Sequence, residues 1–282
     1  MEKRLIIVVM VFCAILTVKA QKISISVKGG YAFGVNKTYG ANTNSFTSLI
    51  NENYSNSIAT VKPVNYSLGS GIPINVAFGY YLNKNISINL GVFYSIGKEF
   101  YGEFTGDGAN SSYRKITLKS SYLGFSPSIK LFYPLNDKIN LYTEVGVSIA
   151  KPQVIFEGYT EETDYYDPSI RHIYKENYKI YGNLCVGGNL GLGINYKITD
   201  LISVNFDVSH LSMQYSPANA TLTKYEIDGT DYTEDRSVSQ SEYVFVDELT
   251  DGDNKGDNPT KVLSFAYSYS NISLNLGVSF YF

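Results

Sequence analysis

Two residues in the sequence have types and spacing suited to hydrolysis, His210 and Ser212. A histidine can act as the general base that activates a serine hydroxyl, and residues two apart on a strand share a face. The nearest carboxylates downstream, Glu226 and Asp228, fall in a segment expected to be a loop. The pair is therefore either a catalytic base and nucleophile or two polar residues where a strand ends.

A second candidate is the stretch 251–258, where oxygen-bearing side chains alternate as in calcium-binding loops. Its carboxylates are Asp251, Asp253 and Asp257, while Lys255 occupies a further ligand position and no glutamate closes the loop. This half-motif predicts a weak calcium site or simply a solvated loop, and we expect no cofactor. From Glu226 to Asp257, eleven acidic residues stand against two basic ones, a net charge near −9, which favours an extended hydrophilic loop.

The elements that must position these residues are eight strands, each with alternating apolar and polar side chains over about ten positions. In the last strand the even-numbered residues from Ile272 to Phe282 are apolar, and the odd-numbered ones are mostly small or polar. The predicted strands cover residues 23–34, 72–82, 86–94, 123–133, 139–149, 184–196, 202–208 and 271–282.

All eight strands share one apolar face, and the opposite face is too small and polar to form an ordinary core. A closed barrel with its apolar face in lipid satisfies this pattern, because closure leaves no unpaired backbone in hydrocarbon. We expect an all-β fold, an eight-stranded antiparallel transmembrane up-and-down β-barrel. A soluble barrel such as a lipocalin would have the apolar face inside.

Short and long connections alternate along the chain. Short turns follow the second, fourth and sixth strands, and the long connections cover residues 36–65, 97–114, 151–178 and 213–261. Membrane barrels place short turns in the periplasm and long loops outside the cell. The even strand number then predicts that both termini are periplasmic. Tyr and Phe must form the aromatic girdles, since the sequence has 26 Tyr and no Trp.

The first twenty residues have the features of a secretory signal peptide, with Lys3 and Arg4 before an apolar run and small residues at the cleavage site. The run is short for a membrane-spanning helix, which needs about twenty residues. We expect residues 1–20 to be cleaved and residues 21–282 to form one barrel domain. The mature chain then keeps only Cys185, so no internal disulfide forms. A net charge of −3 gives no indication of nucleic-acid binding.

Inward positions decide whether the barrel conducts. They carry mostly Gly, Ser and Asn, with larger fillers at Tyr81, Phe93, Phe132, Tyr142 and Tyr281. Four inward charges fall at one level of the barrel: Lys28, Lys130, Glu144 and Asp207. Unpaired charges in a narrow lumen are unfavourable, so we expect a neutral cluster. It is a structural plug, or else part of a proton or small-ion path.

The signal peptide, the eight strands, the turn region 79–88 and the terminal Phe282 resemble the outer-membrane β-barrel family common in Bacteroidetes, similar to the OmpA transmembrane domain and to PorT-like proteins. The resemblance implies an outer-membrane location after export through the periplasm. It also implies that the C-terminal strand, with Phe280 and Phe282, carries the signal read by the barrel-assembly machinery.

His-x-Ser on a late strand is similar to the lipid A 3-O-deacylase barrels, whose residues would correspond to His210 and Ser212 here, although Met213 stands where that family usually has Asn. We expect instead a monomeric, non-enzymatic envelope scaffold in contact with outer-membrane lipid and lipopolysaccharide, whose outer loops serve binding or adhesion. The alternatives are the lipid A hydrolase and a narrow porin or secretion accessory. The acidic segment could bridge to lipopolysaccharide through divalent cations.

Overall fold

The computed structural model describes residues 22–35, 38–39, 46–47, 49–55, 58–106, 112–164, 166–167, 169–250 and 252–282. The predicted signal peptide lies outside these residues. No helix of the described chain is long and apolar enough to cross a membrane. Eight long strands form the barrel: β1 (Ile23–Gly34), β6 (Gly71–Asn83), β7 (Ile86–Gly97), β9 (Ser112–Pro134), β10 (Ile139–Thr163), β12 (Cys185–Lys197), β13 (Ile202–Tyr215) and β19 (Asn271–Tyr281).

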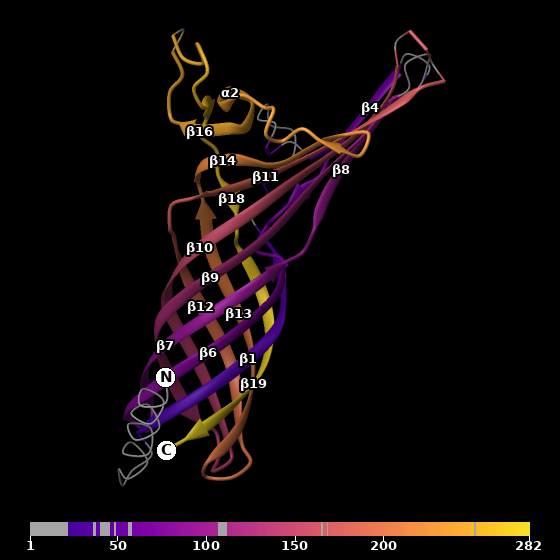
Figure 1. The fold of residues 1–282 in the computed structure, drawn as a ribbon. Helices are drawn as coiled ribbons and strands as arrows, with labels where there is room; N and C mark the ends of the chain where they lie inside the picture. Colours follow the sequence, from indigo (N-terminus) through magenta and orange to yellow (C-terminus); the bar gives the residue numbers. More distant parts are fainter. Residues whose placement is uncertain are drawn as a thin grey trace, which may run out of the picture.

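These strands form a closed antiparallel ring in the order β1–β6–β7–β9–β10–β12–β13–β19, and β19 pairs again with β1. Closure is complete at the C-terminus, where Ser24 pairs with Tyr281 and the Phe282 N–H donates to the Ile23 carbonyl oxygen at 2.9 Å. Figure 1 shows the barrel with the C-terminus at its lower end. The predicted fold class is confirmed.

Short turns close the lower end of the barrel, and polar side chains bond to the backbone in each turn. In the first turn, the Asn83 side-chain oxygen accepts a hydrogen bond from the Asn85 N–H at 2.8 Å. In the second turn, the Asn136 side-chain oxygen accepts from the N–H groups of Lys138 and Ile139. The Thr199 hydroxyl oxygen does the same before β13. Because Asn and Thr can replace a backbone acceptor in this way, the chain reverses within a few residues.

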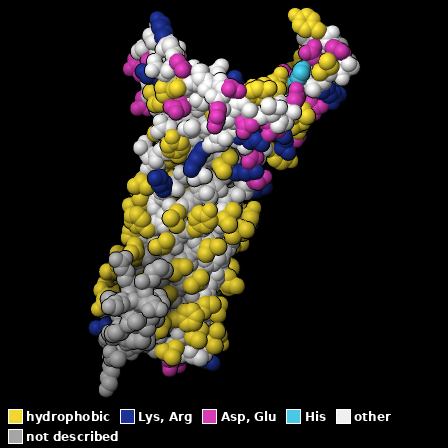
Figure 2. Space-filling view, viewed as in Figure 1, with side chains coloured by type: hydrophobic (Ala, Val, Ile, Leu, Met, Phe, Trp, Pro, Cys, Tyr) yellow, Lys and Arg dark blue, Asp and Glu magenta, His cyan; other side chains and the backbone are white. Residues whose placement is uncertain are grey.

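A belt of exposed apolar side chains surrounds the barrel (Figure 2). It is built by the outward residues of each strand, such as Leu90, Leu131 and Leu192. Tyr80, Tyr133 and Tyr196 lie on the outer surface near the short turns, as predicted for an aromatic girdle. Small polar residues such as Ser26, Ser128 and Asn205 are buried inside.

The apolar face changes side partway along β9 and β10. On β10 the odd-numbered residues up to Ile149 are the apolar, outward ones. Beyond Ile149 the even-numbered residues are buried, including Val154 and Phe156, and Lys151 and Glu157 face outward. A strand that is apolar outside in lipid must become polar outside in water, so this change marks the upper edge of the membrane-spanning region.

Above that edge, β9 and β10 continue into a second part of the sheet, which we call the platform. It is formed by the upper halves of β9 and β10 together with β3, β4, β8, β11, β14, β16 and β17, and it extends obliquely from the barrel (Figure 1). The elements beyond the ring are β2 (Thr38–Tyr39), β3 (Ile50–Ser55), β4 (Ile58–Pro63), β5 (Asn65–Tyr66), β8 (Phe100–Gly106), β11 (Arg171–Gly182), β14 (Pro217–Ile227), β15 (Thr230–Asp231), α2 (Val238–Ser241), β16 (Glu242–Val246), β17 (Thr260–Leu263) and β18 (Tyr267–Ser268).

The expectation that the acidic run from Glu226 to Asp257 is an extended hydrophilic loop is therefore wrong, and the other long connections also contain strands. Residues 112–122 and 150–163 continue the barrel strands, and the segment 217–263, which contains the acidic run, holds β14, β15, α2, β16 and β17. The platform has an apolar core of its own, in which Phe46 contacts the rings of Phe156, Tyr178 and Phe245 edge to face. Burial of these aromatic rings favours folded strands over a solvated loop.

Candidate functional site

The structure brings the four predicted lumen charges together. The Lys28 Nζ lies 3.0 Å from the Asp207 Oδ2 and 3.4 Å from the Glu144 Oε2, and the Lys130 Nζ lies 3.4 Å from the same Glu144 oxygen. All four side chains are largely buried, and that of Asp207 is only 2% exposed. Two lysines and two carboxylates thus form one neutral group across β1, β9, β10 and β13.

Both carboxylates of this charge cluster are fully hydrogen bonded. The Tyr142 hydroxyl donates to the Asp207 Oδ2 at 2.8 Å, and the Asn275 side-chain amide donates to the Oδ1 at 2.8 Å. The Ser128 hydroxyl donates to the Glu144 Oε1 at 2.7 Å. The Lys130 ammonium also lies 4.6 Å from the centre of the Tyr142 ring. A buried ionic group of this kind is retained only when its members satisfy one another.

Strand register explains why these residues meet. Glu144 is directly opposite Lys130 in the β9–β10 pairing, and Lys28 is opposite Gly277 on β19. A Cβ at Gly193 would lie 2.5 Å from the Tyr142 ring, so the absence of a side chain there lets the ring lie flat under the cluster. Small residues on neighbouring strands therefore leave room for the long charged ones.

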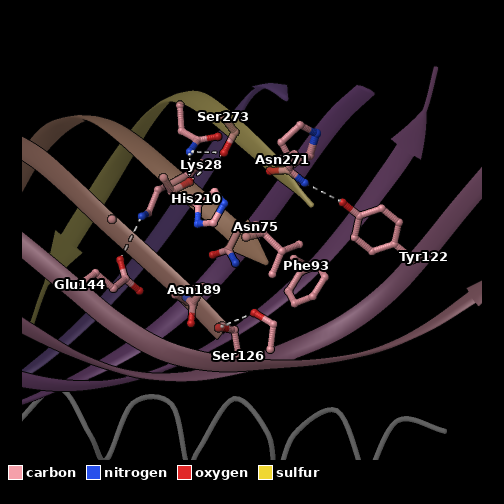
Figure 3. A pocket seen from close by; sticks show the side chains of 18 residues that line it. Lys28, Asn75, Phe93, Tyr122, Ser126, Glu144, Asn189, His210, Asn271 and Ser273 are labelled. Carbon is pink, nitrogen blue, oxygen red and sulfur yellow. Dashed lines mark hydrogen bonds and ion pairs between the residues drawn. The ribbon is translucent and has the colours of Figure 1, made fainter. Parts of the chain in front are cut away.

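Aromatic side chains fill the lumen on both sides of the cluster. Toward the short turns, Tyr81 stacks on Phe132 with ring centres 5.5 Å apart, and Phe132 contacts Tyr142. Toward the platform, Tyr122 contacts Phe93 and Tyr269. Between the cluster and this upper layer is a small cavity of about 120 Å³, lined by Lys28, Glu144 and polar residues such as Asn189 (Figure 3).

By register His210 and Ser212 lie on the outward-facing side of β13, and His210 is also among the residues that line the lumen cavity (Figure 3). His210 pairs in register with Leu190 and Ile272, both exposed belt residues. Within the described chain, neither side chain bonds a carboxylate. The two acids considered as partners are engaged elsewhere: Glu226 pairs with lysines and Asp228 with His172. The geometry therefore supplies no acid to orient His210.

The two described residues considered for calcium, Asp253 and Asp257, have separate partners. Asp251 lies outside the described residues. The Asp253 carboxylate accepts from the Thr250 N–H and pairs with Lys261, and the Asp257 carboxylate accepts from the Ser239 N–H at 2.9 Å. No cluster of three or more His, Cys, Asp or Glu residues suited to a metal is present in the part of the chain described. Cys185 is buried, with its Sγ 3.4 Å from the Ala150 carbonyl oxygen.

Comparison with known proteins gives the family. The OmpA-like transmembrane domain family matches residues 43–214, more than half of the chain. The chain belongs to the OmpA-like transmembrane domain family. No curated protein sequence matches it.

Solved structures similar to this OmpA-like barrel share little sequence with it. Ail of Yersinia pestis is 10% identical, with 93% of this chain and 100% of that chain covered, at a TM-score of 0.33. A major outer membrane protein of Thermus thermophilus is 17% identical, with 92% of this chain and 99% of that chain covered, at a TM-score of 0.37. The protease OmpT of Escherichia coli is 10% identical, with 93% of this chain and 94% of that chain covered, at a TM-score of 0.22. The outer-membrane location therefore rests on the family and the observed ring.

The platform of this OmpA-like barrel is the largest feature that we did not predict from the sequence. Its outer edge is β4, where all six residues from Ile58 to Pro63 are exposed and β3 is the one strand of the described residues that pairs in register with it. A groove of about 600 Å³ crosses β3, β4 and β8 at this tip, lined by Asn51, Glu103 and Lys62 among others. Leu118, Ser120 and Tyr122 stand at alternate positions in the sequence, and this alternation was a signal that β9 continues past the membrane.

A histidine between two carboxylates joins three segments of the platform. The His172 Nδ1 lies 2.8 Å from an Asp228 oxygen, and its Nε2 lies 3.5 Å from an Asp164 oxygen. The hydrogen bond to Asp228 raises the pKa of His172 above its usual value. The same bond holds the pKa of Asp228 below its usual value. Opposite ring nitrogens face the two acids, so this group suits a charged imidazole rather than a single metal ion.

Proposed function

We propose that this protein is a closed, non-catalytic and monomeric outer-membrane scaffold that displays the platform outside the cell as a binding surface. The observation that carries the proposal is the length of β9 and β10, which have 23 and 25 residues. A transmembrane strand needs about 9–11 residues. Roughly half of each strand therefore serves a structure beyond the membrane.

The arrangement of the short turns and the platform supports display toward the outside. Short turns lie at one end of the barrel and the platform at the other, the arrangement that membrane barrels have with short turns in the periplasm. Both termini are then periplasmic, as export behind a cleaved signal peptide requires. The turn region 79–88 and the terminal Phe282 favour a barrel of the type common in Bacteroidetes.

A protein or peptide partner fits the tip of the platform best. Among the residues that the structure describes, no strand pairs with the second edge of β4, and Ile58 is 69% exposed. An open edge can pair with an extended segment of another chain, while neighbouring side chains select it. Lys62 lies on β4 and Glu103 on the adjacent β8, so the groove offers both signs of charge.

The binding test compares cells that express the full chain with cells expressing a variant whose β3–β4 hairpin, residues 50–63, is replaced by a short Gly-Ser linker. We expect attachment to immobilised glycoprotein, or of cells to one another, to fall to the level of cells without the protein. A matched control replaces the lower turn, residues 83–85, with Gly-Ser and should attach normally. Equal attachment of wild type and hairpin variant would overturn the binding role.

The filled lumen argues against a porin or a conducting secretion accessory. The charge cluster lies between two aromatic layers, and all four charges are neutralised inside it. We expect the refolded protein to give no stable current in planar bilayers at neutral pH. Reproducible single-channel steps would overturn the closed-scaffold proposal.

The hydrolase alternative predicts a change that lipid mass spectrometry detects. A serine hydrolase that loses its nucleophile loses several orders of magnitude in rate. Because His210 has no orienting acid among the described residues, we expect overexpression to leave the acyl-chain mass of lipid A unchanged, with wild type and with Ser212→Ala alike. Loss of one hydroxyacyl chain with wild type only would establish the enzyme.

A further inference from the structure

Four lysines lie on the outer surface at the end of the apolar belt and just beyond it: Lys98, Lys119, Lys151 and Lys179. We call this set the lysine row. Lys98 follows β7, and the others lie on β9, β10 and β11. Figure 2 shows dark blue side chains at the upper border of the yellow belt.

Strand register brings three of these lysines, Lys98, Lys119 and Lys179, into one line across the sheet, with Lys151 nearer the belt. Ile155 on β10 pairs with Lys119 on one side and with Lys179 on the other, which places those two residues about 10 Å apart across the sheet. Ile96 pairs with Ser121, so Lys98, two residues further along, lies beside Lys119. Lys151 pairs with Leu123, the last belt residue of β9.

The lysine row differs from the platform in how its charges are satisfied. Further out, basic side chains mostly have acidic partners, as in the Lys115–Glu103, Lys175–Glu226 and Lys224–Glu226 ion pairs. In the row only Lys119 is paired, with Glu99 and Glu157. Within the described chain, Lys98, Lys151 and Lys179 have no carboxylate partner, and all three are exposed.

Lys98 and Lys151 each lie two residues beyond an outward apolar residue, Ile96 and Ile149 respectively. By register, Lys119 and Lys179 are level with Ile155, four residues beyond Lys151. The apolar face of β9 and β10 changes side between Leu123 and Lys119 and between Ile149 and Lys151. The lysine row therefore begins where the hydrocarbon ends, at the level of lipid headgroups. On β1 and β13, across the barrel, the described outward residues near the end of the belt are polar or aromatic, such as Phe33, Ser212 and Gln214.

We propose that the lysine row binds the phosphate groups of the glycolipid in the outer leaflet of the outer membrane. The assignment of the leaflet rests on the orientation given in the proposed function. Several flexible ammonium groups at headgroup depth suit phosphate groups as point charges, and their aliphatic stems can lie along the apolar belt. The site therefore fixes one side of the barrel against the lipid.

The test uses the full mature chain refolded in nanodiscs of phosphatidylcholine that contain bisphosphoryl lipid A, with bound lipid counted by native mass spectrometry. The variant K98Q/K151Q/K179Q removes the three unpaired charges. Each basic residue near an anionic lipid surface strengthens binding about fivefold, so we expect retention of bisphosphoryl lipid A to weaken by about tenfold to a hundredfold. Retention should also fall with added salt.

The matched control is K84Q/K138Q/K197Q, which removes the same charge from exposed lysines beside the short turns. It should retain lipid A as wild type does. Equal retention by wild type and the lysine-row variant, an equal loss in the control, or equal binding of dephosphorylated lipid A by wild type would each overturn the proposal. The last comparison needs no variant to fold. Protease accessibility of the platform on intact cells tests the orientation separately.

Discussion

At the scale of single residues, Glu144 connects the members of the charge cluster in the lumen. Its carboxylate accepts from Lys28, Lys130 and Ser128, whereas Lys130 has Glu144 as its one ion-pair partner in the described chain. Removing Glu144 leaves two buried ammonium groups facing one carboxylate, Asp207. Removing Lys130 leaves the Lys28 ion pairs intact. The two substitutions are therefore unequal, although both residues belong to the same cluster.

We accordingly expect Glu144→Leu to destabilise the barrel by about 3–5 kcal/mol, and Lys130→Met by less. The double variant should cost less than the sum, because Lys28 and Asp207 remain a neutral pair. Urea unfolding in detergent micelles, followed by heat-dependent gel mobility, measures the three free energies. Strictly additive losses would mean that the two side chains do not interact in solution.

The His172 group gives a pH dependence whose sign follows from its pKa shifts. The raised pKa of His172 means that its stabilisation is complete below the ordinary value of 6.5 and is lost as the pH rises through the raised pKa. The lowered pKa of Asp228 means that its share is lost only as the pH falls below 3.8.

We expect hydrogen exchange of residues 169–173 and 226–230 to be slow between about pH 4 and 6.5 and to accelerate at higher pH, after correction for the intrinsic rate. His172→Gln should abolish this dependence. Exchange that stays equally slow at alkaline pH in wild type would show that the imidazole charge does not hold these segments together.

At the scale of elements, the sequence predicts the barrel strands well because one rule governs them all: apolar residues face lipid. The rule also locates Lys28, Lys130, Glu144 and Asp207 on the inner face. It fails above the membrane, where water surrounds the strand and the apolar residues move to the opposite face, as Val154 and Phe156 do. These residues are buried by side chains from distant segments, such as Phe46 and Phe245. The spacing of residues within one strand does not reveal such contacts.

The platform and the barrel should therefore respond separately to a core substitution. Phe156→Ala leaves a cavity among Phe46 and Tyr178, which costs about 3–5 kcal/mol. We expect faster hydrogen exchange in residues 112–122 and 150–163, with residues 124–134 and 139–149 unchanged. Phe125→Ala, on the lipid-facing side of β9, is the matched control and should leave the platform protected.

At the scale of the whole molecule, the C-terminal strand serves closure and, we expect, recognition by the assembly machinery. Phe280 lies in the apolar belt between Ile25 and Ile202, and the backbone of Phe282 bonds to Ile23. Closure uses the Phe282 backbone, which any residue supplies. A recognition signal would instead use the aromatic ring.

Phe282→Ser should therefore refold in detergent to a heat-modifiable barrel with a strand-dominated far-UV spectrum, as wild type does. In cells its assembly into the outer membrane should be slowed several-fold, which pulse-chase measurement of the heat-modifiable form detects. Equal slowing in detergent and in cells would indicate that Phe282 acts only through stability.

The uninterrupted passage of β9 and β10 from barrel to platform has a mechanical consequence. These strands keep one register from Pro134 opposite Asn140 to Ser112 opposite Glu162, with no linker between membrane and platform. A load applied at the tip runs along the strands, so their ladder of hydrogen bonds resists it in shear, many bonds at once, rather than opening bond by bond. The same two strands therefore both anchor the platform in the membrane and carry any force that acts on its tip.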